Sequence, residues 1–376
     1  LQPCYVNLNM SVFRHFSRKL VLNTFKSDIM IQINTHCSVC LRFLSYQPIH
    51  YGKFSKKHML KKVRLYFLFV DGKPDPGPVF IKKEVQTLLR TLTRVDLAKV
   101  FKKRRFGETQ LQQPVYKFMT DEQLQEAYEE AKKKVDTFLQ IPPVVAVRKP
   151  KDKVLSKDPA LQGLDTSAFV FTDISYGVRD SERMILVRET DGTLREADWE
   201  TRDRINQLYF PVAQRQIQTP KMFQDSNLED LLKRGEYNFI LDRACLQFDP
   251  NDPLYQKIVS ITYQCVNDNN HFNELRSTRH FGSFVFFLAW NKLIDNLLLD
   301  IIESEHIEEA KALVELYSHI HQVKYESKEN LQQIDEYIKN HASKKAALEL
   351  AFQAYKNAAK RKGEVEEGIK RAHGLS

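Results

Sequence analysis

Hydrophobic residues recur at helical spacing over most of the chain beyond position 78, with polar residues on the opposite face. Two early stripes comprise Val85, Leu88, Leu89, Leu92 and Val95, and then Leu124, Ala127, Ala131, Val135 and Phe138. Beyond Pro220 the same period continues almost to the end of the chain. Residues 281–290 are nearly all apolar, which is typical of a helix buried in a core. The pattern predicts a mainly α-helical protein.

Residues 168–196 follow a different, alternating pattern. Residues around 169–171 favour strands, and the run at 184–188 alternates between one face and the other. Asp191-Gly192 supplies a two-residue hairpin signal, so a third short run folds back. These runs predict a small antiparallel β-meander within the helical protein.

Capping residues mark where several of the predicted helices begin and end. Thr120 and Gln123 have the spacing of a capping box, so a helix begins there. Asp198 is placed to cap a helix that follows the meander, and Pro211 ends it. Residues 144–165 hold prolines among many charges, and we expect an extended connection along the surface.

These boundaries divide the chain into four parts. Residues 1–77 are a leader and linker outside the fold, 78–165 two helices with a basic loop, 166–220 the meander with its capped helix, and 221–376 a helical domain. In the last part, Asp252 and Pro253 resemble the helix start at the turn between tetratricopeptide repeats. No second copy follows at a fixed period, so a tetratricopeptide-like body remains one form of the helical prediction.

The positive charge of the protein is concentrated at its beginning. The 376 residues carry a formal charge of +9, but residues 1–70 hold eleven Lys and Arg against Asp28 alone. The remainder is therefore close to neutral, and any affinity for RNA must come from local patches. The segment from Met10 is rich in Arg, Lys and Ser and lacks acids, which is typical of a mitochondrial transit peptide.

A run of four cations is the most specific candidate site in the sequence. Lys102, Lys103, Arg104 and Arg105 follow one another directly, between two phenylalanines. Cations offer phosphate contacts and neighbouring aromatic rings can stack on unpaired bases, so the run is a candidate RNA-binding site. The alternative is a charged segment that only faces solvent.

Smaller basic clusters have competing explanations. Arg276 and Arg279 lie at a predicted helix start, where exposed N–H groups also favour phosphate, but such arginines also bridge helices. Arg179 and Arg183 flank the first turn of the meander and suit insertion into RNA or a neighbouring protein. The last cations comprise Lys356, Lys360, Arg361 and Lys362, for which we expect a complementary role at the C-terminal end of the final helix.

The sequence gives little support to catalysis, metal binding or a membrane span. It holds neither a glycine-rich phosphate loop nor the nucleophile and zinc-protease motifs, and only 12 glycines. Cys37 and Cys40 have ligand spacing, but no second pair follows. No apolar stretch approaches the length of about 18 residues that a spanning helix needs. We therefore predict no enzyme activity, no cofactor, no metal and no membrane span.

The amino-acid sequences of several segments resemble those of one protein family. TDISYGVRDSERMILVRETDGTLREADWETRDRINQLYFP at 172–211 is similar to protein twenty-two of the small subunit of the mitochondrial ribosome. PVFIKKEVQTLL, PVYKFMT, LRSTRHFG and IDNLLLD extend the likeness from about Pro78 to about Lys360. The resemblance implies a structural constituent of that subunit in the mitochondrial matrix, with ribosomal RNA and other mitochondrial ribosomal proteins as partners.

The alternative function is a free matrix adaptor of the tetratricopeptide type, which would hold peptide partners in a helical groove. Sedimentation distinguishes the two, because a constituent stays with the small subunit in moderately high salt and an adaptor leaves it.

The leader generates a prediction about import. Replacing Arg14, Arg18 and Lys19 with Glu should leave the protein in the cytosol, because import depends on an electropositive amphipathic segment. Cell fractionation measures the outcome. Undiminished accumulation in the matrix would refute the transit-peptide interpretation.

Overall fold

The computed structural model describes residues 31–33, 74–102, 116–163, 166–325 and 330–373. The transit segment and the Cys37–Cys40 pair lie outside the described residues. The chain divides into two compact units, one of Leu1–Pro48 with Pro150–Pro211 and one of Ile49–Lys149 with Val212–Ser376. The first contains a sheet and the second is helical, so the prediction of a mainly α protein with a small antiparallel meander is confirmed.

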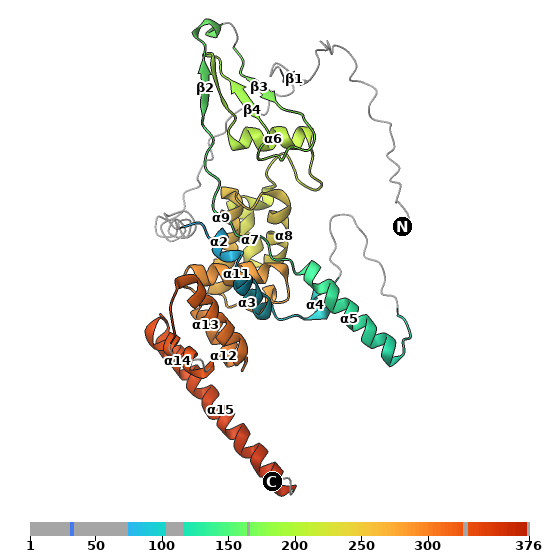
Figure 1. Ribbon diagram of the computed structural model, residues 1–376, viewed down its shortest axis with the longest axis vertical. Coiled ribbons are helices and arrows are strands. Elements are labelled where there is room, and N and C mark those ends of the chain that lie inside the picture. Colours follow the sequence, from blue (N-terminus) through green and yellow to red (C-terminus); the bar gives the residue numbers. More distant parts are fainter. Residues whose placement is uncertain (1–30, 34–73, 103–115, 164–165, 326–329, 374–376) are drawn as a thin grey trace. The chain divides into compact units, whose positions relative to one another are not determined.

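The sheet unit contains five short antiparallel strands in the order β1-β3-β4-β5-β2, and helix α6 (Figure 1). Their bounds are β1 Ile31–Ile33, β2 Val154–Lys157, β3 Phe169–Thr172, β4 Ile185–Arg188, β5 Thr193–Glu196 and α6 Trp199–Tyr209. Ile185, Val187 and Ala197 are buried, with Ile205 of α6 packed against them. One face of the sheet therefore packs on α6, as the alternation of β4 predicts.

Strand β1 was not predicted, since residues 1–77 were expected to lie outside the fold, yet it pairs with β3. Strand β2 was not predicted either. All four of its residues are exposed, and it pairs only with β5 at the edge of the sheet. An exposed edge strand carries no hydrophobic alternation, so its sequence resembles an extended connection.

The hairpin between β4 and β5 is one residue longer than Asp191-Gly192 predicted. The backbone N–H of Glu189 donates to the carbonyl of Thr193 at 2.9 Å, which leaves three residues in the loop. Gly192 closes the loop at φ 81°, a conformation that glycine adopts without strain. A Cβ at Gly192 would lie 2.0 Å from the carbonyl oxygen of Asp158, so the position also needs glycine for space.

The helical unit is built from thirteen of the described helices. In its first segment these are α2 Gly77–Phe80, α3 Lys83–Thr93, α4 Leu97–Val100 and α5 Asp121–Phe138. In its second they are α7 Asp225–Lys233, α8 Tyr237–Gln247, α9 Pro253–Asp268, α10 Phe272–Leu275, α11 Arg279–Trp290, α12 Asp295–Glu303, α13 Ile307–His321, α14 Asn330–Asn340 and α15 Lys345–Ala372. The capping box of α5 and the Asp252 cap of α9 form as predicted.

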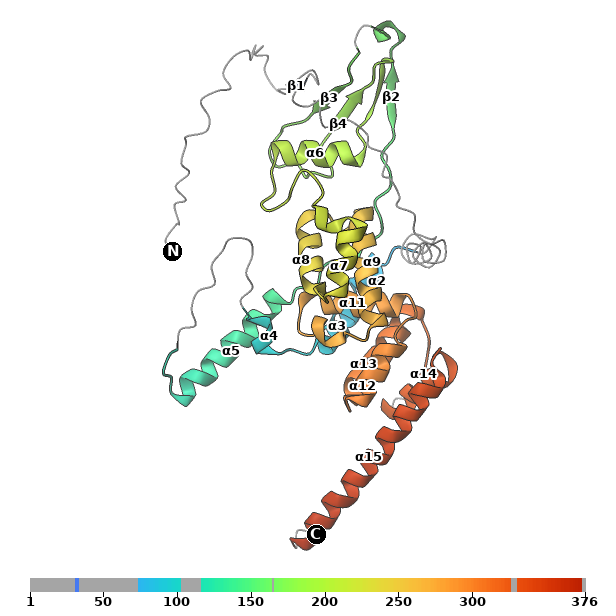
Figure 2. The same cartoon turned by 180° about the vertical axis from the view of Figure 1, so that it is seen from behind.

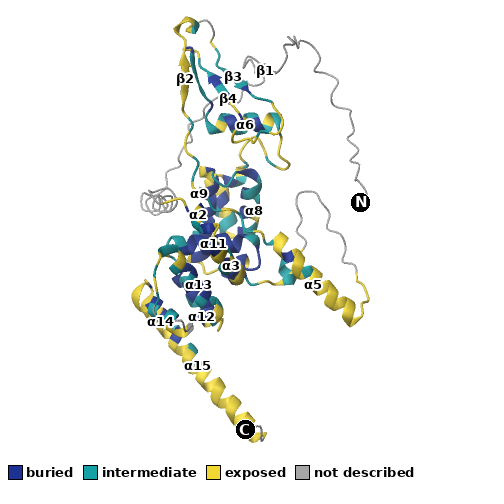
Figure 3. Ribbon diagram, in the orientation of Figure 1, coloured by how far each residue is buried: buried dark blue, intermediate teal, exposed yellow. Residues whose placement is uncertain are grey.

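Helix α11 is the centre of the helical core. Every residue from His280 to Ala289 is buried, and α3 and α13 pack against the helix (Figures 1 and 2). Figure 3 shows α11 as the most continuously buried helix of this unit. From α9, the ring of Tyr263 packs on Phe284 and Phe287, and its hydroxyl forms a 2.7 Å hydrogen bond with Ser283. The core helix predicted from residues 281–290 is confirmed.

A buried carboxylate holds the last two helices to this core. Asp295, in the first turn of α12, accepts hydrogen bonds from the Tyr337 hydroxyl at 2.7 Å and from the backbone N–H groups of Ser343 and Lys344 at 2.7 and 3.0 Å. It therefore caps the N-terminus of α15 from another helix. Burial and the hydrogen bond to Asp295 both raise the pKa of Tyr337, so its phenol stays protonated.

The core position of α11 predicts a severe effect of a charge there. Phe287→Asp should lower the free energy of unfolding by about 3–5 kcal/mol, because a carboxylate without a partner would lie in an apolar site. Phe287→Leu keeps the site apolar and should cost about 1–2 kcal/mol. Chemical denaturation measures both, and an Asp variant as stable as the wild type would show that α11 is not core.

Candidate interaction surfaces

The predicted RNA-binding run begins at the end of the short helix α4. The Asp96 carboxylate caps this helix by accepting from the Ala98 N–H at 3.0 Å. Phe101 then packs edge-on against Phe138 at the C-terminal end of α5, with ring centroids 5.4 Å apart. Lys102 is exposed directly after this contact, and Lys103–Arg105 lie outside the described residues. The aromatic residue before the run thus anchors it to the protein.

Arg276 lies in a buried ionic network. Its guanidinium contacts Asp300 at 3.1 Å and Glu309 at 3.3 Å, and only 6% of the side chain is exposed. Arg94 donates two hydrogen bonds to the same Glu309, at 2.8 and 2.7 Å. The network therefore joins the end of α3 to α12, α13 and the segment before α11. Both cations are already matched by carboxylates.

Arg279 belongs to a second cluster on α11. Its guanidinium lies 2.9 Å from the Asp242 carboxylate of α8, and the Nε2 of His280 lies 2.8 Å from the same oxygen. The Arg279 side chain is 37% exposed, whereas that of His280 is buried. Asp242 thus links α8 to two neighbouring side chains of α11.

These contacts favour the helix-bridging alternative for Arg276. A phosphate would have to reach a guanidinium that is buried and already paired. The N-terminus of α11 is also inaccessible to a phosphate, because Ser277 and Thr278 before it are buried. The Arg279 side chain is partly exposed, but it is already paired with Asp242.

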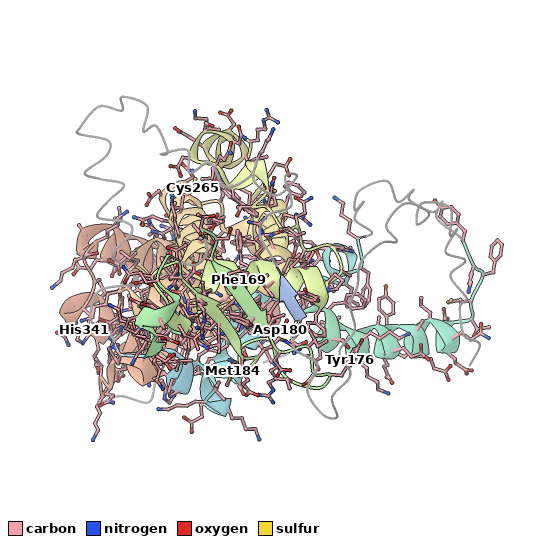
Figure 4. The ribbon with its side chains drawn as sticks, turned by 90° about the horizontal axis from the view of Figure 1, so that it is seen from above. Phe169, Tyr176, Asp180, Met184, Cys265 and His341 are labelled. Atoms are coloured by element: carbon pink, nitrogen blue, oxygen red, sulfur yellow. The ribbon has the colours of Figure 1, made fainter. Side chains whose placement is uncertain are left out.

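The loop from Asp173 to Glu182 is fastened from inside by a buried arginine. Arg183 donates to the carbonyls of Asp173, Ser175 and Val178 at 3.0, 2.8 and 3.0 Å, and its guanidinium lies 3.7 Å from the centre of the Phe210 ring. Figure 4 labels Tyr176 and Asp180 of this loop; Tyr176 lies farther than Asp180 from Phe169 in this view and is 93% exposed. Arg183 thus fixes the loop's shape, whereas Arg179 is exposed.

The role of Arg183 could have been read from the alternation in the sequence. Ile185 and Val187 are buried, and position 183 falls on the same face of the run. Arg202, which donates to the carbonyl of Arg183, was missed, because a lone Arg on a helix has no such signal. Burial lowers the pKa of Arg202, yet guanidinium remains charged.

The expected dipole role of the four cations from Lys356 to Lys362 is wrong, because none of them lies in the last turn of the helix. Helix α15 continues to Ala372, and its last turn holds Lys370 and Arg371. Lys356 lies four turns earlier, with its Nζ 4.2 Å from the centre of the Phe352 ring, and Lys362 contacts Glu305. The dipole effect falls off within the last turn, so it does not reach these residues.

The described residues show little that favours catalysis. They contain no group of three or more residues placed to hold a metal ion, and none of their helices is long and apolar enough to cross a membrane. Burial raises the pKa of the Cys245 and Cys265 thiols, which makes them poor nucleophiles. A cavity of about 280 Å³ beside Cys245 and Arg279 is lined largely by Phe, Pro and Ile side chains.

The network around Arg276 generates a prediction about stability. Arg276→Ala should cost about 2–3 kcal/mol, because Asp300 loses its buried partner and Glu309 keeps only Arg94. Arg279→Ala removes a partly exposed partner and should cost about 1 kcal/mol. Thermal or chemical unfolding measures both. An Arg276→Ala protein that is fully stable but detaches from RNA would reverse the assignment.

Comparison with known proteins identifies the family. The profile of the family described as mitochondrial 28S ribosomal protein S22 matches residues 78–322. The small ribosomal subunit protein mS22 of Bos taurus is 38% identical over 288 residues, which cover 75% of this chain and 79% of that protein. The protein of the same name from Mus musculus is 38% identical over 285 residues, covering 74% and 79%.

The matched region runs from α2 to the end of α13 and includes the described strands β2 to β5. It therefore contains the core around α11 and the ionic networks of Arg276 and Arg279. The resemblance seen in the sequence is confirmed: the chain belongs to the mitochondrial 28S ribosomal protein S22 family, a family of structural proteins of the small subunit of the mitochondrial ribosome.

Proposed function

We propose that this chain is a non-catalytic brace within the small subunit of the mitochondrial ribosome, in the matrix. Its helical surfaces pack on neighbouring ribosomal proteins, and the run Lys102–Arg105 contacts ribosomal RNA. Family membership supports the location and the structural role. It also disfavours the matrix adaptor, which the comparisons do not support.

The RNA assignment is supported by the density of charge at the Lys102–Arg105 run, and by the pairing of three arginines of the helical unit with carboxylates of the fold. Arg148 pairs with Asp252 at 2.7 Å with both side chains about nine-tenths buried, and Arg94 and Arg276 share Glu309. These cations stabilise the fold and are poorly placed for phosphate. Lys102, in contrast, is exposed and opens a run of four cations. Four adjacent charges produce a strong local potential on a body that is otherwise near neutral.

The proposal excludes Arg276 from RNA contact and leaves Arg279 a secondary candidate. Arg279 is already held by Asp242, so a phosphate would gain less there than at a cation without a carboxylate partner. The absence of enzyme activity and of a cofactor follows from the structural role and remains a prediction.

The proposed RNA contact predicts a salt-dependent defect. Changing Lys102, Lys103, Arg104 and Arg105 to Gln should leave the fold intact but weaken retention on the subunit, with a defect that is largest at low salt and becomes smaller as salt is raised. Each lost phosphate contact should remove about one unit from the slope of log affinity against log salt. Sedimentation through gradients of increasing salt measures retention, and crosslinking of the wild-type segment to ribosomal RNA checks the contact directly.

The matched control removes four cations from α15 by changing Lys356, Lys360, Arg361 and Lys362 to Gln, and it should have the smaller effect. If the Lys102–Arg105 variant sediments like the wild type at every salt and the segment gives no RNA crosslink, these cations only face solvent. Protein contacts alone would then hold the chain in the subunit.

A further inference from the structure

Helix α5 and the residues before it expose a row of large apolar side chains. Tyr116 is 91% exposed and Phe118 is fully exposed. Leu124 and Tyr128, in the first turns of the helix, are 46% and 49% exposed. Figure 3 shows α5 exposed over nearly its whole length. A cluster of aromatic and aliphatic side chains in water is unfavourable unless another surface covers it.

These side chains continue a stripe whose other end is already covered. Leu124, Tyr128, Ala131 and Val135 follow at i, i+4, i+7 and i+11, so they share one face of the helix. Val135 is 4% exposed, and Phe138 beyond it contacts Phe101 while remaining 58% exposed. The sequence predicts a buried face along all of α5, but of its eighteen residues only Val135 is buried.

The exposed part of the helix is stabilised locally. Thr120 and Gln123 form both hydrogen bonds of a capping box, at 3.4 and 3.2 Å. Asp121 and Glu122 lie in the first turn, where acids complement the helix dipole. The face is therefore shaped before a partner arrives, which lowers the entropic cost of binding.

The charge of this region indicates which partner fits. Five acids and no Lys or Arg occur in residues 121–131, the part of α5 that carries the exposed stripe, and Lys132, Lys133 and Lys134 follow toward its anchored end. Lys117 is the one cation between Tyr116 and Ala131. The acids comprise Asp121, Glu122, Glu126, Glu129 and Glu130. Most fall on the face opposite the stripe, about 10 Å away across the helix, so salt weakens their effect there, whereas Asp121 lies beside the stripe. The net negative charge disfavours a phosphate backbone on this face and favours a partner whose Lys and Arg side chains reach around the helix to the acids.

We propose that Tyr116, Phe118, Met119, Leu124 and Tyr128 form a docking face for a neighbouring protein, one that presents an apolar surface surrounded by Lys and Arg. The proposal rests on the proposed function and adds to it a partner for one surface. It gives the α4–α5 segment two contacts, with RNA at the basic run beside its anchored end and with protein at its free end. Aromatic and methionine side chains are those most enriched at the centre of protein interfaces.

Photocrosslinking in assembled small subunits tests which molecule covers the face. A benzoylphenylalanine in place of Tyr128 should give a crosslink to a second protein of the subunit. The same group in place of Glu126, on the opposite face, should give at least about tenfold less of that product, because burial concentrates at the core of an interface. A Tyr128 product with ribosomal RNA, with another segment of this chain, or no product at all would each overturn the proposal.

A pair of charge-matched variants tests its importance. Leu124→Asp with Tyr128→Asp should reduce incorporation about tenfold in competition with the wild type, because two carboxylates would enter an apolar contact. Glu126→Asp with Lys133→Asp changes the net charge by the same amount on the other face and should incorporate normally. Circular dichroism should show both folded, since all four positions are exposed.

Normal incorporation of the Leu124/Tyr128 variant would refute the docking face while leaving the proposed function intact. A wild-type chain that does not sediment with the small subunit would instead refute the proposed function itself.

Discussion

Helix α11 imposes the main constraint on this structure, because its ten residues from His280 to Ala289 are all buried and so need cover on every side. Helices α3, α9 and α13 supply that cover from distant parts of the chain. Gly282 lets the segment after α5 approach as well, since a Cβ there would lie 2.5 Å from the Cδ1 of Ile141. The residues before and after the meander therefore form one helical unit around a single core helix.

A core of this kind requires that charged groups near it have partners. The ends of buried helices bring polar groups out of water, and Arg94, Arg276, Asp295 and Glu309 lie at such ends, matched with partners of opposite charge or with backbone groups. In a protein that works beside RNA, a cluster of arginines is easily taken for a binding site. Here the buried arginines stabilise the fold, and the surfaces proposed for binding are exposed segments around α4 and α5. Under the proposed function, the fold and RNA contact depend on different Lys and Arg residues.

Much of the fold was predictable because its signals are local. The capping box at Thr120, the Asp252 cap and the apolar run at 281–290 each depend on a few neighbouring residues, and the structure confirms all three. Strand β2 was missed because an exposed edge strand has no periodic signal. The burial of Arg276 was not predictable either, since Asp300 and Glu309 lie far along the chain and nothing local indicates that they meet it.

The exposed stripe of α5 is another feature that the local sequence could not fully predict. Helical spacing predicts an apolar face but says nothing about whether this chain or another molecule covers it. For a chain of a ribosomal protein family, the answer depends on its neighbours in the assembled subunit.

The most direct test is an electron cryomicroscopy map of the assembled mitochondrial small subunit. We expect cations of the Lys102–Arg105 run to lie about 2.7–3.2 Å from phosphate oxygens of ribosomal RNA, and Leu124 and Tyr128 to be buried against another protein. A map in which that run faces solvent, while the Leu124–Tyr128 face lies on RNA or stays uncovered, would contradict this expectation.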